Sequence, residues 1–211
     1  GFLVRGRKGH YHPGPALEGM AAVPRREEAQ WLAQRAAARL REPLARLSAQ
    51  HGGPAHFGIL EDGMVTYLVK ENGAGKDLFT AEQMQLEAYC SAIGKVLLAA
   101  MDEPALEDYL SSGPFVALTA NTLTDPAAIR ADVEQARRRG VGFDRCEIRE
   151  DLFCMAVPVR MADGRTAGAI SLSLLGHTPD RAEQGRIIRQ LRRAATGAVN
   201  ALEDSVGAGA L

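Results

Sequence analysis

Residues 152–174 hold the pattern that most constrains the fold, because two apolar runs flank the pair Asp163-Gly164. An Asp-Gly pair between two such runs favours a β-hairpin with a two-residue turn. That turn places Cys154 opposite Ser173. We therefore expect an antiparallel hairpin with a defined register, which a three-residue loop would flip so that every side chain changed face.

The two faces of this hairpin differ in polarity, since side chains on one face recur at every second residue. One face is wholly apolar and suits a protein core: Phe153, Met155, Val157, Ile170, Leu172 and Leu174. The other face mixes apolar, small and polar side chains: Leu152, Cys154, Ala156, Ser171 and Ser173. Two serines also suit a plain solvent-exposed sheet surface, whereas their apolar neighbours favour the lining of a ligand cavity.

Helices and further strands surround the hairpin without regular βαβ alternation. Apolar periodicity predicts helices over residues 14–23 and 25–41, and Pro43 starts or kinks a further helix that ends near residue 51. Capping residues and prolines predict other helices that start at Ser91, Asp102, Asp125 and Thr178-Pro179. Strands are expected near residues 2–4 and 10–13, over 56–60 and 64–70 around Glu61-Asp62-Gly63, and over 78–84. The last helix is expected to fray after Asp204. This order predicts an α+β fold around an antiparallel sheet.

Length, charge and cysteine content exclude several classes of protein. The 211 residues suit one medium domain with appendages. The net charge of −1 gives no overall attraction to nucleic acid or membranes, and no apolar run reaches the roughly 18–20 residues of a membrane helix. The 3 cysteines lack CxxC spacing and no signal peptide is visible, which favours the cytoplasm. Because the chain starts at Gly1 without methionine, we expect a fragment of a longer protein.

Motifs for nucleotides and metals are missing from the sequence. The pairs Gly75-Lys76 and Gly94-Lys95 lack the following serine or threonine and the upstream glycine of a phosphate-binding loop. The 5 histidines show neither HxxxH nor HExxH spacing. We therefore predict no cofactor and no metal, the alternative being a metal held by Cys90, Asp144 and Cys154.

The hairpin belongs to a set of segments that resembles the IclR-type bacterial transcription regulators over roughly residues 16–205. The matching segments are Ser91-Ala92-Ile93-Gly94-Lys95-Val96-Leu97-Leu98-Ala99, Arg137-Arg138-Arg139-Gly140-Val141-Gly142-Phe143-Asp144 with Glu147-Ile148, Leu152-Phe153-Cys154-Met155-Ala156-Val157-Pro158-Val159, and Ala169-Ile170-Ser171-Leu172-Ser173. Residues 1–5, with Tyr11, Gly14 and Leu17, look like the end of the family's winged helix-turn-helix, without the two helices that precede it.

This resemblance implies a three-part architecture. Residues 1–15 would be the remnant of the wing, residues 16–24 a linker, and residues 25–211 an effector-binding domain. The implied fold is a GAF/profilin-like antiparallel sheet flanked by helices, preceded by a linker helix and a two-stranded wing remnant. Dimers or tetramers are implied as well.

The resemblance also implies the residues of an effector pocket: Leu78, Ala92, Ile93, Asp144, Leu152, Cys154, Ser171 and Ser173. Counting along the hairpin places three of these residues, Cys154, Ser171 and Ser173, on one face without the help of the family. The segment 83–90 lacks the glycine and proline that the family often has there, so the ligand cannot be copied from a relative.

The chemistry of these residues suggests a small organic acid, aromatic acids included. Amides at the start of the Ser91 helix suit an anion, and the two hairpin serines can donate hydrogen bonds. Asp144 could accept from a hydroxyl or ammonium group, or repel a second carboxylate. We expect a cytoplasmic regulator that binds this effector and double-stranded DNA, with no membrane partner. Arg5, Arg7 and Lys8 of the wing would contact phosphates, weakly in this chain alone.

Two other functions are compatible with the sequence. An enzyme could use Cys154 as a nucleophile, with His56 or His177 as its base. A GAF-like sensor without a DNA role would share the effector pocket. The arginines of residues 25–46 are interpreted as a solvated helix face.

Overall fold

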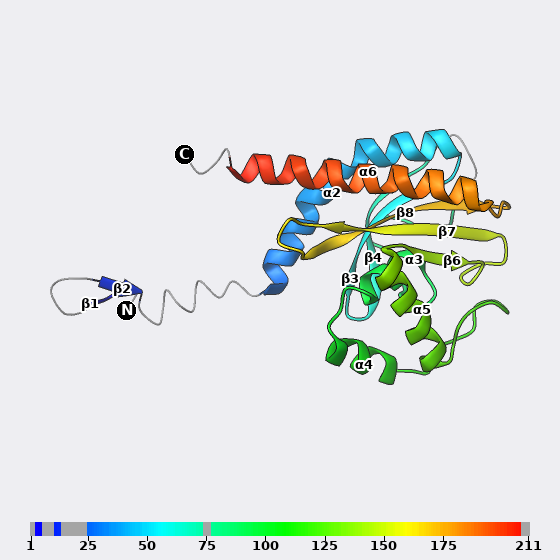
Figure 1. The fold of residues 1–211 in the computed structure, drawn as a ribbon, viewed down its shortest axis with the longest axis horizontal. Helices are drawn as coiled ribbons and strands as arrows, with labels where there is room; N and C mark the ends of the chain where they lie inside the picture. The colour runs from blue at the N-terminus through cyan, green and yellow to red at the C-terminus, as the bar shows by residue number, and fades with distance from the viewer. Residues whose placement is uncertain (1–2, 6–10, 14–24, 74–76, 208–211) are drawn as a thin grey trace.

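A six-stranded antiparallel sheet is the centre of the computed structural model, which describes residues 3–5, 11–13, 25–73 and 77–207 (Figure 1). The strand order is β5-β4-β3-β8-β7-β6, and each neighbouring pair is antiparallel. The bounds are β3 Ala55–Glu61, β4 Met64–Glu71, β5 Gln85–Glu87, β6 Gly142–Arg145, β7 Leu152–Arg160 and β8 Thr166–Leu175. The predicted α+β class is confirmed.

Helices cover both faces of the sheet (Figure 1). Helix α2 (Arg25–His51) and helix α6 (Arg181–Gly207) pack against each other over one face. Helices α3 (Ala92–Leu98), α4 (Glu103–Ser111) and α5 (Pro126–Arg139) lie on the other. None of the helices within the described ranges is long and apolar enough to span a membrane.

The hairpin of β7 and β8 separates two hydrophobic cores, as its alternation predicts. Phe153, Met155 and Leu172 belong to the core under α2 and α6. Leu152 and Cys154 belong to the core shared with α3, α4 and α5. Successive residues of one strand therefore serve different layers of the molecule.

The hairpin register is confirmed, but the predicted two-residue turn is wrong. Cys154 pairs with Ser173 and Ala156 with Ser171. The loop has three residues, 162–164, and two hydrogen bonds close it. The amide of Gly164 donates to the carbonyl of Met161 at 2.9 Å, and the amide of Met161 donates to the carbonyl of Arg165 at 2.8 Å. Gly164 has a φ of 86°, as a type I turn followed by a left-handed glycine requires. A register shift between Val159 and Arg160 restores the predicted pairs.

Several predicted boundaries are confirmed. The side chains of Ser91, Asp102 and Asp125 cap α3, α4 and α5, and α5 ends at Gly140 with a φ of 62°. Strands β3 and β4 pair around Asp62-Gly63, both with positive φ. Strands β1 (Leu3–Arg5) and β2 (Tyr11–Pro13) pair as an antiparallel ribbon.

Other predictions are wrong in detail. Pro43 does not start a new helix but lies inside the single helix α2, which bends along its length, so the alternative of a kink is confirmed (Figure 1). Residues 78–84 form no strand, since the chain turns at Gln83 (φ 66°). Gln83 and Met84 exchange backbone hydrogen bonds with Tyr67 of β4, and the regular strand pairing begins at Gln85.

The C-terminal helix also differs from its prediction. It begins at Arg181, after Asp180 rather than at Thr178-Pro179, because the Asp180 carboxylate accepts from the amide of Glu183 at 2.8 Å. It continues beyond Asp204 to Gly207. The predicted helix over residues 14–23 lies outside the described residues.

Candidate functional site

All eight predicted pocket residues line one cavity between the sheet and α3. They are Leu78, Ala92, Ile93, Asp144, Leu152, Cys154, Ser171 and Ser173. Six further residues complete the lining: Tyr67, Phe79, Thr80, Leu86, Ser91 and Ile148. The cavity measures only about 10 Å³, which is about the space of a single water molecule. Its walls therefore leave almost no free space in this structure.

Close contact of α3 with its neighbours depends on two glycines of the matching segments. A Cβ on Gly94 would lie 2.1 Å from the carbonyl oxygen of Ala88. A Cβ on Gly142 would lie 2.4 Å from the carbonyl oxygen of Ala92. Real Cβ atoms do not approach backbone this closely, so only glycine lets α3 pack onto β6. This contact brings Ala92 and Ile93 to the cavity.

The predicted anion site at the amides of Ala92 and Ile93, at the start of α3, stays a prediction. The helix has 7 residues, and the Ser91 hydroxyl already accepts from the amide of Gly94 at 3.0 Å. We therefore build the candidate site on the polar side chains of the cavity.

Asp144 is the most unusual of these side chains. It is fully buried on β6. Its Oδ1 accepts from the amides of Glu147 at 2.7 Å and Ile148 at 3.4 Å. Its Oδ2 has no hydrogen-bond partner among the described residues. Burial, helped by the charge of Glu147 and opposed by the amide hydrogen bonds and by Lys95, raises the pKa of Asp144 to about 7.

Cys154 and Ser173 face each other across the hairpin. The Cys154 Sγ lies 3.3 Å from the Ser173 Oγ, and both residues are buried. Burial and the nearby Asp144 raise the pKa of the Cys154 thiol well above its ordinary value. The thiol is therefore protonated at neutral pH and is a poor nucleophile.

The two histidines that an enzyme would need are already paired with other side chains. Nε2 of His56 lies 2.9 Å from the Thr80 hydroxyl, and burial lowers the pKa of His56 to about 3. His177 is exposed and pairs with Glu183. The described part of the chain has no group of three or more His, Cys, Asp or Glu able to hold a metal ion, so Cys90, Asp144 and Cys154 form no such group. The cysteine-enzyme alternative has no base in place.

Residues 77–80 form a wall of the cavity, of which only Leu78 is among the predicted pocket residues. The ammonium of Lys70 on β4 donates to the Asp77 carboxylate at 2.7 Å and to the carbonyls of Leu78 at 2.7 Å and Thr80 at 2.6 Å. These bonds tie the wall to the sheet. Phe79, between them, is 50% exposed. Long-range contacts of this kind leave no periodic signal in a sequence.

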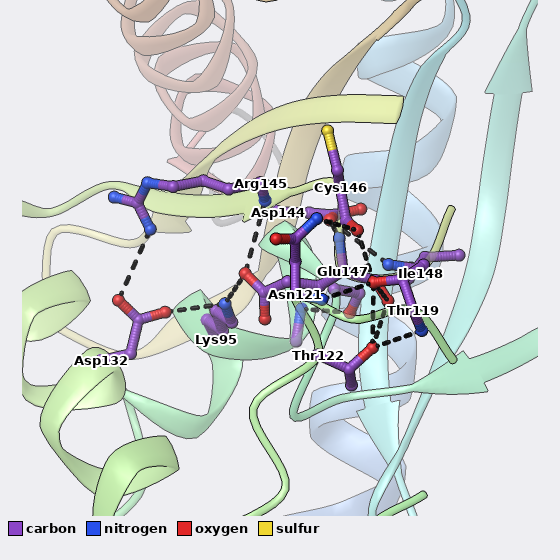
Figure 2. A network of polar contacts seen from close by, with 12 residues as sticks. Lys95, Thr119, Asn121, Thr122, Asp132, Asp144, Arg145, Cys146, Glu147 and Ile148 are labelled. Atoms are coloured by element: carbon purple, nitrogen blue, oxygen red, sulfur yellow. Dashed lines mark hydrogen bonds and ion pairs between the residues drawn. The ribbon is translucent and has the colours of Figure 1, made fainter. Parts of the chain in front are cut away.

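Behind the cavity lies a buried ion cluster, shown in Figure 2. The Lys95 ammonium lies 2.7 Å from Oδ2 of Asp132 on α5 and 2.5 Å from Oε1 of Glu147. Arg145 approaches the other oxygen of Asp132 at 3.7 Å. The carbonyl of Glu147 accepts from the Thr122 hydroxyl at 2.6 Å. This cluster fixes the turn that presents Asp144.

A larger groove of about 800 Å³ lies elsewhere, beside the β3–β4 and β7–β8 loops. It is open to solvent and contains none of the predicted pocket residues. Two of its polar side chains are already paired, Arg165 with Glu28 and Gln30 with Glu61. We therefore regard the closed cavity as the candidate site.

The predicted phosphate contacts of the wing stay predictions. Arg5 ends β1, but its side chain is not described, and Arg7 and Lys8 lie outside the described residues. The predicted domain bounds at residues 15 and 24 fall outside them as well.

Comparisons with known proteins identify the family. The family described as "Bacterial transcriptional regulator IclR C-terminal" matches residues 33–199. The HTH-type transcriptional regulator XynR of Escherichia coli (strain K12) is 31% identical over 160 residues, which are 75% of this chain and 64% of that protein. The chain thus spans less than two thirds of that relative.

Solved structures agree. The C-terminal domain of the E. coli transcriptional regulator KdgR is 25% identical, with a TM-score of 0.70 over 80% of this chain and 97% of that one. An IclR homologue from Microbacterium hydrocarbonoxydans, complexed with 4-hydroxybenzoate, is 24% identical, with a TM-score of 0.71 over 97% of this chain and 80% of that one. The chain therefore belongs to the IclR family of bacterial transcriptional regulators and contains the family's C-terminal domain.

Proposed function

We propose that this chain is the effector-sensing part of a DNA-binding transcription regulator, and that its closed cavity takes a small organic acid, aromatic acids included. One observation carries the proposal: hydroxyls, a thiol and an unpartnered carboxyl oxygen converge in a buried cavity. Buried polar groups without partners are costly and rare in folded proteins. A polar ligand would supply the missing partners.

The chemical class of the ligand rests on the lining and on one relative. Ser171 and Ser173 offer hydroxyl donors, and Leu78 and Leu152 offer an apolar surface. The homologue from M. hydrocarbonoxydans was crystallised with 4-hydroxybenzoate, an aromatic acid. An acid group at the serines and an apolar body between the leucines match both observations.

Binding must open the cavity, because about 10 Å³ cannot hold any organic acid. Residues 77–80 are the wall that can give way, since they belong to neither a helix nor a strand and are held mainly by Lys70. A ligand therefore selects an open arrangement of this wall. Such a difference in affinity between two states is what an effector needs to act as a switch.

DNA binding and assembly complete the proposal. Residues 1–15 would be the wing remnant, 16–24 the linker and 25–211 the effector domain. In the intact cytoplasmic protein, a complete winged helix-turn-helix would bind double-stranded DNA as a homodimer or homotetramer. Arg5, Arg7 and Lys8 would contact phosphates. A preference of about 1–3 kcal/mol for one dimeric arrangement is typical of such coupling.

Calorimetry tests the acid proposal. The folded chain is titrated with aliphatic and aromatic monoacids, alongside the variants Ser173→Ala and Ser111→Ala. Ser111 is exposed at the end of α4 and serves as the control. Loss of a hydrogen bond to a charged group should weaken binding roughly tenfold or more in Ser173→Ala only. Failure of the folded protein to bind any acid would refute the acid proposal.

A mobility-shift assay tests the regulatory proposal. The intact protein is mixed with its upstream DNA, with and without the acid that binds in calorimetry, and its mass is measured by sedimentation. The acid should change the affinity for DNA without dissociating the dimer or tetramer. An affinity for DNA that the acid leaves unchanged would favour the sensor without a DNA role.

A further inference from the structure

We propose that Asp144 is the specificity-determining residue of the cavity: it carries a proton in the complex and donates it through Oδ2 to the ligand's carboxylate. An anionic ligand would thus bind together with one proton. This inference rests on the proposed function, and it adds the charge class that the cavity accepts. The argument starts from the two oxygens of the Asp144 carboxyl group.

Those two oxygens have different roles. Oδ1 accepts from the amides of Glu147 and Ile148, which fixes the plane and direction of the carboxyl group. Oδ2 is buried without a partner among the described residues, and Asp144 lines the cavity. An ionised carboxylate can only accept hydrogen bonds, whereas a protonated one also donates. Oδ2 can therefore bind a ligand carboxylate only as an O–H group.

The charged groups around Asp144 leave no cation for a second anion. Lys95 of α3 is bound to Asp132 of α5 and to Glu147, and Arg145 also approaches Asp132. Two cations and two anions leave this cluster neutral. An ionised Asp144 and an anionic ligand would then be two uncompensated like charges in a closed space.

The other titratable neighbours cannot supply a positive charge either. They are Tyr67 on β4, Cys90 before α3, Cys146 after β6 and Cys154 on β7. Each is neutral when protonated. His56, which contacts Thr80 and Tyr67 of the lining, stays neutral as well, because burial lowers its pKa to about 3. Within the described lining of the cavity there is no lysine, arginine or histidine.

Protonating Asp144 at neutral pH costs little free energy. Burial already raises the pKa of Asp144 to about 7 in the empty cavity. A bound anion disfavours the charged form of Asp144 further, so binding takes up protons. The dissociation constant of a monoacid should be constant below about pH 7 and rise up to tenfold per pH unit above it. A dicarboxylate would leave its second charge unmatched and should bind much more weakly.

The variant Asp144→Asn imitates the protonated state. Its amide oxygen can accept from the amides of Glu147 and Ile148, while its NH₂ group takes the place of the Oδ2 hydroxyl. We expect this variant to bind monoacids with an affinity that does not change with pH. Asp163→Asn, in the exposed β7–β8 loop, is the matched control and should behave as the wild type.

Calorimetry at pH 8 in two buffers of different ionisation enthalpy measures the proton uptake directly. The probes are benzoate, propionate, benzamide and benzylammonium. We expect benzoate or propionate to bind with uptake approaching one proton in wild type and Asp163→Asn, and with none in Asp144→Asn.

Each other outcome overturns the inference. An acid that binds the wild type without proton uptake refutes the role of Asp144 and leaves the proposed acid sensor intact. Binding of benzylammonium alone, with an affinity that increases as pH rises, refutes both the role of Asp144 and the acid sensor. Asp144 would then be an ionised residue that binds a cation. Absence of binding by all four probes to the folded protein refutes both as well.

Discussion

Replacing Lys95 with methionine tests whether the buried ion cluster holds the cavity region together. The Lys95 side chain is 1% exposed, and its ammonium is 2.7 Å from Asp132 and 2.5 Å from Glu147. Methionine keeps much of the apolar volume but leaves Asp132 and Glu147 without their cation. Removing one partner of a buried ion pair costs about 3–5 kcal/mol. We expect that loss in the free energy of unfolding, measured in urea at pH 7.

The pH dependence of this loss identifies its cause. Burial raises the pKa of Glu147, and Lys95 opposes that rise. Without Lys95, the folded-state pKa of Glu147 moves further above its unfolded value. The folded protein then binds more protons than the unfolded chain, so stability falls as pH rises between those two values, by up to about 1.4 kcal/mol per pH unit. The deficit of Lys95→Met should therefore be smaller at pH 5 than at pH 8.

Two further variants make the result decisive. Arg130→Met removes ion pairs to Glu103 and Glu107 that are largely exposed, and should cost less than about 1 kcal/mol. Adding Glu147→Gln to Lys95→Met should recover part of the stability, because glutamine needs no cation. A Lys95→Met deficit no larger than that of Arg130→Met, or equal at pH 5 and pH 8, would refute the reasoning.

Three further predictions use other features of the fold. Gly142→Ala should lower the unfolding free energy by about 1–3 kcal/mol, because its Cβ would meet the backbone of Ala92. Gly197→Ala in α6 should raise the unfolding free energy by roughly 0.5–1 kcal/mol, since nothing lies within 4 Å of its Cβ. Thermal unfolding compares the two variants, and equal effects would contradict the packing argument. In the native protein, a maleimide should label the half-buried Cys146 before the buried Cys154, as mass spectrometry would show; early labelling of Cys154 would contradict its burial. The pKa of Asp144 in the folded protein, about 7, lies above its ordinary value of 3.8. The free energy of unfolding of the wild type should therefore fall by roughly 1.4 kcal/mol per pH unit between these two values. Urea unfolding of Asp144→Asn at several pH values should lack this contribution.

Local signals predicted much of the fold. Caps at Ser91, Asp102 and Asp125 act within one turn of helix, and all three were placed correctly. The faces of the β7–β8 hairpin were also correct, although the loop is one residue longer than expected. A bulge beside Val159 compensates for that residue. Alternation therefore constrained the register more strongly than the turn did.

Contacts between distant segments could not be predicted in this way. The wall formed by residues 77–80 depends on Lys70, whose three bonds have no sequence signature. Lys95 lies in a segment that matches the family and in a pair that lacks the other residues of a phosphate-binding loop, and neither context predicts its pairing with Glu147, 52 residues away. The family resemblance implied eight of the fourteen lining residues. The volume of the cavity depends on contacts between distant segments, so its closed state was not predictable.

The course of α2 past Pro43 has a mechanical consequence. Its 27 residues form one helix that bends along its length, as a proline inside a helix causes (Figure 1). The part from Ala33 to Leu47 packs over the sheet, one layer away from the strand that carries Ser171 and Ser173. The angle of the bend therefore sets the direction in which the first turns of the helix leave the packed layer.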